Sequence, residues 1–392
     1  MGEMRTRVGI VGAGPAGLML SHLLHLAGIE SVVLELRSRE YVEHRVRAGV
    51  LEHGTVELLR ATGLADRLDR EALIHRGIEF RFDGVGHRID LTGLTGRSIW
   101  IYGQQELVKD MIAARLGAGG TIRFEVDDVV LEGIEGDTPT VRYRHQGEQQ
   151  ELICDVIAGC DGFHGVSRDA IPDRVLSVYR HEFPFAWLGI LAEVAPSTDE
   201  LIYAHHDRGF ALHSLRSPEI SRLYLQVAPD EDIDEWPDDR VWGELRTRLA
   251  ANGWSLTDGP VLEKGIAAMR SFVVEPMQYG RLYLAGDAAH IVPATGAKGL
   301  NLAIADVRAL AQGLQAWFEE GDTRPLGGYS ERCLRRVWRV QEFSSSMSSM
   351  FHVYPGHDPF RRRLQRAQLA YVCNSEAASK SLAENYVGLP LD

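Results

Sequence analysis

The chain has 392 residues, of which 45% are hydrophobic and 25% are charged. This composition excludes collagen-like, coiled-coil and disordered chains, and the length predicts two or three domains with a large core. The 55 acidic residues outnumber the 42 basic ones, which gives a formal net charge of −13 and argues against a nucleic-acid partner and against adhesion to anionic membranes.

The cysteines Cys154, Cys160, Cys333 and Cys373 show no metal-binding spacing, so we expect reduced thiols, no metal site and a cytoplasmic protein. No run of about 18 apolar residues occurs, which predicts that no segment spans a membrane.

The first predicted unit is a strand, a glycine turn, a helix and a second strand. Residues 6–11 (TRVGIV) and 31–36 (SVVLEL) have the apolar runs of short buried strands. Between them, a G-x-G-x-x-G turn at residues 12–17 opens a stretch with helical periodicity. The unit predicts a dinucleotide-binding fold, because the turn places a phosphate on the helix N-terminus.

Each position of this turn has a physical role. Gly12 permits the tight turn, Gly14 lets the backbone approach a pyrophosphate, and Gly17 lets the helix pack on the strand. Glu35, at the end of the second strand, is placed to accept hydrogen bonds from a ribose diol. The motif does not distinguish FAD from NAD.

Two later strands also end in an acid. In residues 151–168 an apolar strand leads to Asp161, and in residues 281–303 another leads to Asp287. An aspartate at such a strand end can bind a ribityl hydroxyl, and the glycine-rich turn after Pro293 can offer amides to a pyrophosphate or to a flavin edge.

Residues 201–227 contain two alternating stretches around a turn, which predicts a β-hairpin. Side chains two apart share a face, so Ser214 lies beside Arg216 on one strand and Arg222 beside Tyr224 on the next. Two guanidiniums and two hydroxyls on one face suit a carboxylate. The alternative, a solvated outer face, stays open on periodicity alone.

In order and spacing, these motifs resemble those of the class A flavoprotein monooxygenases, the aromatic hydroxylases, over the whole chain. The likeness is strongest to the members that act on 4-hydroxybenzoate, in the segments RAGVLE (47–52), CDGFHG (160–165), RSFVVEPMQ (270–278), GDAAHIVP (286–293), TGAKGLNLA (295–303) and ENYVGLP (384–390). The resemblance implies an enzyme that holds FAD and uses NAD(P)H and O2. It implies conversion of 4-hydroxybenzoate to 3,4-dihydroxybenzoate through a flavin hydroperoxide and the substrate phenolate.

The resemblance also implies roles for individual residues. The substrate is expected to lie against Ser214, Arg216, Tyr224, Pro293 and Ala294, and the catalytic residues are expected to be Tyr203, Tyr386, His75 and Arg222. The expected FAD contacts are Gly12, Gly14, Gly17, Glu35, Arg47, Gln104, Asp161, Asp287, Gly299, Leu300 and Asn301. The expected NAD(P)H contacts are His164, Arg270, Arg37 and Tyr41. In this scheme Tyr203, Tyr386 and His75 form a relay that removes the phenol proton from a closed site.

Two positions depart from the family pattern. Leu36 stands where NADPH-specific members have an arginine. Since a 2′-phosphate needs a positioned cation, we expect the enzyme to use either NADH or NADPH, with a modest preference. Ala294 stands where the family has a second consecutive proline, and alanine lacks the fixed φ. We therefore expect a looser loop and poorer coupling of coenzyme oxidation to hydroxylation.

The predicted fold class is α/β (α+β mixed): a Rossmann-like FAD-binding domain, a mixed β-sheet substrate domain and a helical C-terminal region. The predicted boundaries are 1–181 with 270–295, then 182–269, then 296–392. Residues 78–91 also have strand patterns and are expected to join the substrate sheet. The resemblance implies a homodimer.

Alternatives remain open for the function. The same fold could act on 4-aminobenzoate or 3,4-dihydroxybenzoate, which the pocket residues do not separate from 4-hydroxybenzoate. A flavin halogenase is disfavoured because no GWxWxIP-like segment occurs. A non-catalytic FAD-fold binding protein is disfavoured because both Asp161 and Asp287 are kept.

Overall fold

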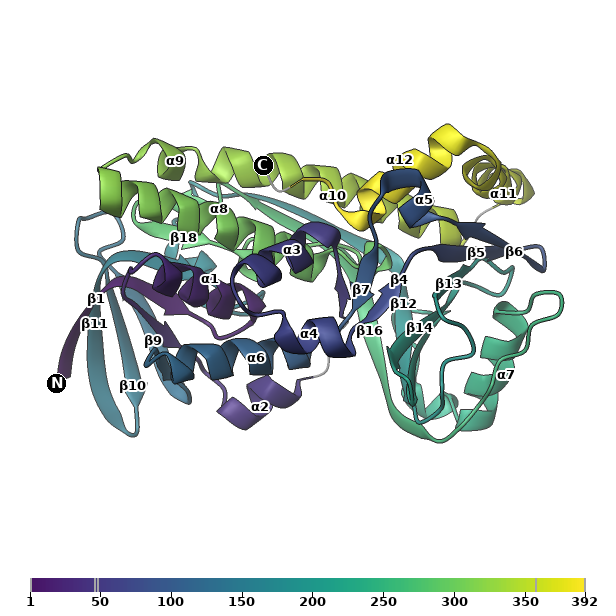
Figure 1. The fold of residues 1–392 in the computed structure, drawn as a ribbon, viewed down its shortest axis with the longest axis horizontal. Helices are drawn as coiled ribbons and strands as arrows, with labels where there is room; N and C mark the ends of the chain where they lie inside the picture. The colour runs from purple at the N-terminus through teal and green to yellow at the C-terminus, as the bar shows by residue number, and fades with distance from the viewer. Residues whose placement is uncertain (1, 46, 48, 357, 391–392) are drawn as a thin grey trace.

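The computed structural model describes residues 2–45, 47, 49–356 and 358–390. Met1 and residues 391–392, at the ends of the predicted regions, lie outside the described residues, as does Ala48 of segment 47–52. The described chain forms two lobes, and long helices of the C-terminal third run along one side of both (Figure 1). The mixed α/β fold predicted from the sequence is confirmed.

The first lobe is built on a sheet with the order β17-β18-β11-β1-β2-β8, to which β10 and β9 are added beside β11. Its strands are β1 (Gly2–Val11), β2 (Ser31–Leu34), β8 (Thr121–Arg123), β9 (Val126–Glu132), β10 (Thr140–His145), β11 (Glu148–Gly159), β17 (Gln278–Tyr279) and β18 (Leu282–Leu284). The central strands β1, β2, β8, β11 and β18 pair in parallel, as a dinucleotide-binding fold requires.

The second lobe is built on a sheet with the order β19-β16-β12-β15-β14-β13-β5-β6. Its strands are β5 (Ile78–Phe82), β6 (Val85–Ile89), β12 (Ser177–Ala192), β13 (Leu201–Ala204), β14 (Ala211–Ser217), β15 (Ile220–Val227), β16 (Val261–Glu275) and β19 (His290–Ile291). The predicted hairpin is β14 and β15. The segment at residues 78–91, which was expected to join this sheet, does so through β5. A smaller sheet pairs β7 (Ile99–Ile101) with β3 (Val50–Leu51) and β4 (Leu73–His75).

Helices cover both lobes. Those before the C-terminal third are α1 (Pro15–Leu26), α2 (Arg39–His44), α3 (His53–Ala61), α4 (Asp66–Glu71), α5 (Leu91–Thr95), α6 (Gln104–Gly117) and α7 (Asp238–Arg248). Those of the C-terminal third are α8 (Gly299–Glu320), α9 (Arg324–Gly327), α10 (Tyr329–Phe351), α11 (Pro359–Asn374) and α12 (Glu376–Val387). The 3-10 turns are η1 (Arg168–Ala170), η2 (Ile233–Glu235), η3 (Gly286–Ala288) and η4 (Ala294–Gly296). In the described part of the chain, no helix is long and apolar enough to cross a bilayer.

The second sheet separates two apolar cores. One face, with Ile190, Ile202 and Leu223, packs against Trp242 and Leu245 of α7. The other face carries Tyr203 and packs against α10, α11 and α12, the last of which carries Tyr386. Burial alternates strictly along β15, because successive side chains point to opposite faces.

The predicted boundaries 181/182 and 269/270 fall inside β12 and β16 rather than in loops. These strands pair from Ser177 with Glu275 to Ala192 with Val261, and the pairing is irregular between Glu182 and Ala186. The predicted domain boundaries therefore lie near an irregularity in one long ladder of paired strands. The division into domains stays a prediction.

Candidate active site

The glycine turn lies at the end of β1, where the backbone crosses close to β11. Gly12 has a φ of +103°, and a Cβ there would lie 2.4 Å from the Cys160 carbonyl oxygen, so only glycine fits. Gly14 precedes α1 and faces open space, and no side chain caps the helix N-terminus. The first amides of α1 are thus available to an anion.

Glu35 is tied to this turn by its own carboxylate. Its Oε2 accepts a hydrogen bond from the Ala13 amide at 2.7 Å, and its Oε1 accepts one from the Arg37 amide at 2.8 Å. The acid that ends β2 is therefore held beside the glycine turn, where the ribose of a bound dinucleotide would lie.

Asp161 and Asp287 follow the ends of β11 and β18. Asp161 Oδ2 accepts hydrogen bonds from the Ser167 amide and hydroxyl, whereas its buried Oδ1 has no partner among the described residues. Burial raises the pKa of both carboxyls. The Asp287 side chain is nevertheless open to solvent, so its carboxylate can still accept a hydrogen bond from a ligand hydroxyl.

The structure brings several predicted arginines together around Asp287. Arg47 and Arg270 both interact electrostatically with its carboxylate, and Arg47 also interacts with Arg222. Burial, and then the neighbouring Arg45, lower the pKa of Arg47. Arg45 was not singled out from the sequence, because nothing in its local pattern separates it from other exposed arginines.

Arg216 lies in the same cationic group. Burial, and then Arg222, lower the pKa of Arg216. Its Nη1 donates to the Arg47 carbonyl at 3.0 Å, and its Nη2 donates to the Gln105 side chain. Sequence reasoning selected the neighbouring Gln104 and missed Gln105, since only the three-dimensional approach of α6 to β14 identifies the residue that meets Arg216.

The predicted relay tyrosines meet inside the second lobe. Tyr203, on β13, and Tyr386, on α12, are 2% and 1% exposed, and their hydroxyl oxygens are 2.7 Å apart. Tyr203 donates to the Thr295 carbonyl at 3.1 Å, so Tyr386 donates to Tyr203 in this arrangement. Burial raises the pKa of both phenols.

His75 is fully buried on β4, but neither ring nitrogen has a hydrogen-bond partner among the described residues. Burial lowers its pKa to about 4. No direct hydrogen bond therefore joins His75 to Tyr386 here, and the third member of the predicted relay stays a prediction.

Asn301 uses its side chain inside the protein. The oxygen accepts from the Glu52 amide and the Thr55 hydroxyl, and the nitrogen donates to the Val50 carbonyl. Only the backbone of Asn301 remains for a ligand. It lies in the first turn of α8, which no side chain caps, together with the backbones of Gly299 and Leu300.

A buried ion pair anchors the segment that carries Tyr386. Lys298 Nζ lies 2.7 Å from Glu52 Oε1 and donates to the Tyr386 carbonyl at 2.8 Å. Burial lowers the pKa of Lys298. No local pattern in the sequence predicts this contact, because the two residues are far apart in the chain.

The expected NAD(P)H residues form two groups. His164 and Arg270 both contact Phe163, with the Arg270 guanidinium 4.0 Å from the ring centre. Arg37 lies over the ring of Tyr41 at 5.3 Å, on the exposed surface after β2. Phe163, which joins the first pair, was not predicted.

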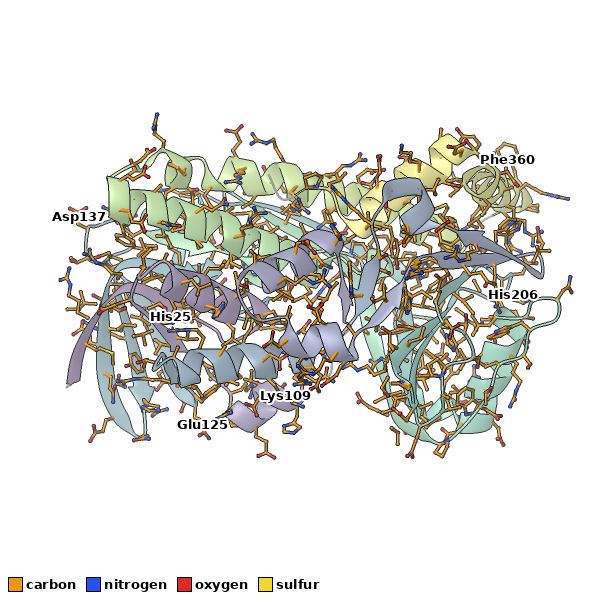
Figure 2. All side chains as sticks on the ribbon, in the orientation of Figure 1. His25, Lys109, Glu125, Asp137, His206 and Phe360 are labelled. Atoms are coloured by element: carbon orange, nitrogen blue, oxygen red, sulfur yellow. The ribbon has the colours of Figure 1, made fainter. Side chains whose placement is uncertain are left out.

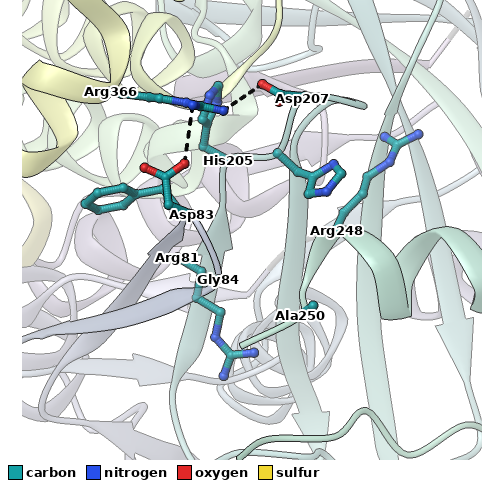
Figure 3. Close-up of a pocket in the computed structure, with 10 residues that line it drawn as sticks. Arg81, Asp83, Gly84, His205, Asp207, Arg248, Ala250 and Arg366 are labelled. Carbon is teal, nitrogen blue, oxygen red and sulfur yellow. Dashed lines mark hydrogen bonds and ion pairs between the residues drawn. The ribbon is translucent and has the colours of Figure 1, made fainter. Parts of the chain in front are cut away.

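A polar cavity of about 220 Å³ lies away from these residues, between β5, the end of α7 and α11. Its Arg366 pairs with Asp83 and Asp207 (Figure 3). Its other arginines, Arg81 and Arg248, also pair with carboxylates. Because its cations are compensated internally, the cavity offers no excess charge to a ligand, and we do not assign the active site there.

The comparisons with known proteins agree with this geometry. The model of a family described as "FAD binding domain" matches residues 5–344. The p-hydroxybenzoate hydroxylase of Acinetobacter baylyi is 45% identical over 100% of this chain and 97% of its own length. A 3-(3-hydroxy-phenyl)propionate/3-hydroxycinnamic acid hydroxylase of Burkholderia cenocepacia is 26% identical over 78% of this chain and 56% of its own. The structure of p-nitrophenol 4-monooxygenase from Pseudomonas putida matches with a TM-score of 0.85 at 20% identity, covering 98% of both chains.

The chain therefore belongs to the FAD binding domain family and, within it, to the flavoprotein hydroxylases that use FAD, NAD(P)H and O2. The residues present fit FAD. The amides of α1 are open to a pyrophosphate, Asp161 has an unpartnered buried oxygen, and Arg222 has a buried Nε without a partner among the described residues.

The buried histidines predict a loss of stability in mild acid. His75 has a folded pKa of about 4 against about 6.5 in the unfolded chain. As the pH falls through this window, the unfolded chain binds the proton first, so the free energy of unfolding falls. His213, with a pKa of about 4, and His352, with a pKa of about 3, act in the same direction.

Urea unfolding between pH 4.5 and 6.5 tests this. His75→Gln should reduce the slope of stability against pH by up to about 1.4 kcal/mol per pH unit. The exposed His25→Gln serves as the control. An unchanged slope in His75→Gln would contradict the assignment.

Proposed function

We propose that the protein hydroxylates 4-hydroxybenzoate beside its hydroxyl group, giving 3,4-dihydroxybenzoate and water while NAD(P)H and O2 are consumed. One observation carries the proposal: the Tyr203 and Tyr386 hydroxyls meet at 2.7 Å in an apolar core, on the sheet face that also carries Arg216. The likeness to the Acinetobacter baylyi p-hydroxybenzoate hydroxylase supports it.

The carboxylate end of the substrate is assigned to the β14–β15 hairpin. Ser214 pairs across the ladder with Arg222, and Arg216 and Tyr224 lie on the same face. No carboxylate pairs with Arg216 or Arg222 among the described residues. A half-buried guanidinium without an acidic partner suits a bidentate carboxylate.

The hydroxyl end is assigned to Tyr203. Its oxygen can accept the phenol hydrogen bond beside the one that it receives from Tyr386. For a proton to pass along the hydroxyls, Tyr203 must turn its own proton from the Thr295 carbonyl to the Tyr386 oxygen, 2.7 Å away. A phenol that gives up its proton becomes electron-rich at the neighbouring ring carbon, where the new oxygen is added. Neutral tyrosines cannot keep an extra proton, so each gives up its own proton as it receives one. We propose that the proton leaves the closed site toward His75 without bulk water being admitted.

FAD, when bound, takes electrons from the nicotinamide and activates oxygen. The residues of this chain bind and orient it. We assign its pyrophosphate to the amides after Gly14, its ribose to Glu35, and its ribityl chain to Asp161 and Asp287. We assign its ring edge to the first turn of α8, where the backbone amides of Gly299, Leu300 and Asn301 lie.

The other benzoates remain competitors of the same class. In 4-aminobenzoate, the neutral amine is too weak an acid to pass a proton to Tyr203, so its ring would be less activated. In 3,4-dihydroxybenzoate, one of the two carbons beside the 4-hydroxyl already carries a hydroxyl, so only one of the two ring orientations presents a carbon that can be hydroxylated. Both compounds are therefore expected to be hydroxylated more slowly than 4-hydroxybenzoate by the same residues.

The coenzyme is assigned to the two groups of residues described above. We propose that His164 and Arg270 bind the nicotinamide coenzyme and that Arg37 and Tyr41 meet its adenosine end. Leu36 is 56% exposed after β2 and cannot pair with a 2′-phosphate. Arg37 is the cation left at this position, so both coenzymes are expected to work.

We also propose a cytosolic homodimer. The free thiols of the four cysteines suit a reducing compartment. Along α11, Phe360, Leu364 and Tyr371 are 70%, 55% and 63% exposed, and their spacing places them on one face. Phe360 lies at the outer end of the molecule (Figure 2). A second copy covering this face would bury that apolar surface.

The substrate assignment predicts a specific pattern of turnover. With 4-hydroxybenzoate, coenzyme oxidation should yield 3,4-dihydroxybenzoate, whereas 4-aminobenzoate and 3,4-dihydroxybenzoate should yield mainly hydrogen peroxide. Tyr203→Phe should keep 4-hydroxybenzoate binding within a few-fold and lower the hydroxylated fraction about tenfold or more, because the phenol proton loses its acceptor. Product and peroxide are quantified together.

A matched control is Tyr371→Phe, on the exposed face of α11. Wild-type protein that forms no 3,4-dihydroxybenzoate would refute the function. Normal product yield from Tyr203→Phe would refute the relay alone.

The coenzyme assignment predicts that kcat/KM for NADPH and NADH differs by less than ~10³-fold, which corresponds to about 4 kcal/mol. Leu36→Arg should shift the ratio toward NADPH by about tenfold, since it adds a charge-assisted hydrogen bond to the 2′-phosphate. Leu26→Arg, at another exposed leucine, should not shift it. A larger wild-type preference would contradict the assignment.

The dimer proposal predicts the mass of two chains in light scattering at micromolar concentration. Phe360→Glu combined with Leu364→Glu should give monomers, because a desolvated carboxylate opposes burial. Val130→Glu, at an apolar position on β9 that is 50% exposed, should stay dimeric. A dimer that survives the double substitution would place the interface elsewhere.

A further inference from the structure

The helix α10 carries a buried polar face that the reaction scheme does not use. Gln341 is 5% exposed, and Ser344, Ser348 and His352, the last just beyond the helix end, are 0% exposed. Their spacing of three and four residues places them on one side of the helix. Buried polar groups are costly unless they are hydrogen-bonded, so their partners indicate what this face does.

The partners lie along the loop that follows β19. Gln341 Nε2 donates to the Ile291 carbonyl at 2.7 Å, where the loop begins. Ser348 Oγ lies 2.8 Å from Thr295 Oγ1, in η4. Ser344 Oγ would lie 2.7 Å from a Cβ at Gly296, so the helix and the loop are in close contact. The polar face therefore follows the loop through Pro293 and Ala294.

The donor and acceptor roles in this contact can be assigned. Ser348 donates its hydroxyl proton to the Ser344 carbonyl at 2.9 Å, so Thr295 Oγ1 must donate to Ser348 Oγ. The carbonyl of the same Thr295 accepts from Tyr203 at 3.1 Å. One residue of the loop is thus held by α10 through its side chain and receives the relay hydroxyl on its backbone.

The end of the same polar face contacts the residues that line the proposed substrate site. His352 Nδ1 must donate to the Ser348 carbonyl at 2.9 Å, which leaves Nε2 to accept the Trp187 indole proton at 2.7 Å. Burial keeps this histidine neutral, with a pKa of about 3. Trp187 in turn packs on Tyr224, with ring centres 4.9 Å apart.

We propose that Gln341, Ser348 and His352 are positioning residues for the hydroxylation. They hold loop 291–296 and Trp187 so that the Thr295 carbonyl meets Tyr203 and the pocket stays closed. This inference rests on the proposed function. Helix α10 spans both lobes (Figure 1). On this proposal, it connects the predicted flavin side of the site to the predicted substrate side.

The loop needs such support because one of its residues supplies no rigidity. Ala294 is exposed and begins η4, and alanine does not fix φ as proline would. The residue before it, Pro293, has a φ of −55° and a ψ of 136°, the conformation required before a proline. A 3-10 turn also has a φ that proline can adopt. Ala294→Pro therefore fits this backbone and would rigidify the loop independently of α10.

The test compares two serines of one helix. Ser348→Ala removes the acceptor of the Thr295 hydroxyl, whereas Ser346→Ala removes a hydroxyl that donates to Glu342 on the same helix. Each full-length holoenzyme is given 4-hydroxybenzoate and NADPH, and the ratio of 3,4-dihydroxybenzoate to hydrogen peroxide is measured. This ratio does not depend on how much of the protein is folded, so a purely structural defect would leave it unchanged.

Ser348→Ala should lower the product-to-peroxide ratio by about three- to tenfold, the rate cost of one neutral hydrogen bond. KM for 4-hydroxybenzoate should change less than twofold, because the carboxylate contacts are untouched. Adding Ala294→Pro to Ser348→Ala should recover at least half of the lost ratio. The control Ser346→Ala should match the wild type.

Thr295→Val breaks the same contact from the loop side and keeps the backbone carbonyl, so it replaces Ser348→Ala if that variant does not fold. Combining the two should cost no more than the worse single change, since both remove one interaction. A wild-type ratio in Ser348→Ala or Thr295→Val overturns the inference. Failure of the wild type itself to form product would instead refute the proposed function.

Discussion

The pairing of β12 with β16 is the constraint on which the rest of the site depends. This antiparallel ladder runs from Ser177 with Glu275 to Ala192 with Val261, and it belongs to the sheet that carries Tyr203. Phe272 of β16 also pairs with Ile291, so the loop that follows is fixed to the same ladder. A rigid two-stranded connection suits an enzyme whose two ligands must meet at a fixed distance, because small displacements of reacting groups are costly.

Buried polar contacts then fix the loops at the end of this framework. Asp306, on α8, accepts from the Gly286 amide at 3.0 Å and lies 2.6 Å from His290 Nε2. Burial alone would lower the pKa of His290, but the Asp306 carboxylate raises it on balance. Lys298 and Glu52 form a second such pair beneath Tyr386. Interactions of this kind contribute little net stability but are costly to break. Their effect is therefore to hold the loops on the two sides of the site in one position each.

The sequence predicted the elements because their signals are local. The glycine turn, the alternating hairpin around Ser214 and the helical periodicity of the C-terminal third each depend on residues near one another in the chain. The meeting of Tyr203 with Tyr386 was expected only through the family resemblance, since periodicity does not report which distant segments touch. Contacts such as Ser348 with Thr295 escaped entirely, because a serine inside a helix has the same local pattern whether it faces a loop or water. The domain boundaries were placed inside continuous strands for a similar reason: composition changes along a strand that crosses from one lobe to the other.

The net charge of −13 conceals the electrostatics of the site. FAD, the coenzyme and a benzoate are all anions, yet Arg47, Arg216, Arg222 and Arg270 form one chain of electrostatic contacts around Asp287. Crowding of like charges and burial lower the pKa of Arg216, which means that the ligand-free protein bears a cost for holding this cation. A bound anion relieves that cost directly, so part of the binding energy comes from repulsion already present in the protein. The net negative charge of the chain repels anions at a distance, whereas this group of cations attracts the anion that fits it. On the proposed assignment, selectivity for small carboxylates therefore follows from where a few cations lie, and the overall charge serves solubility.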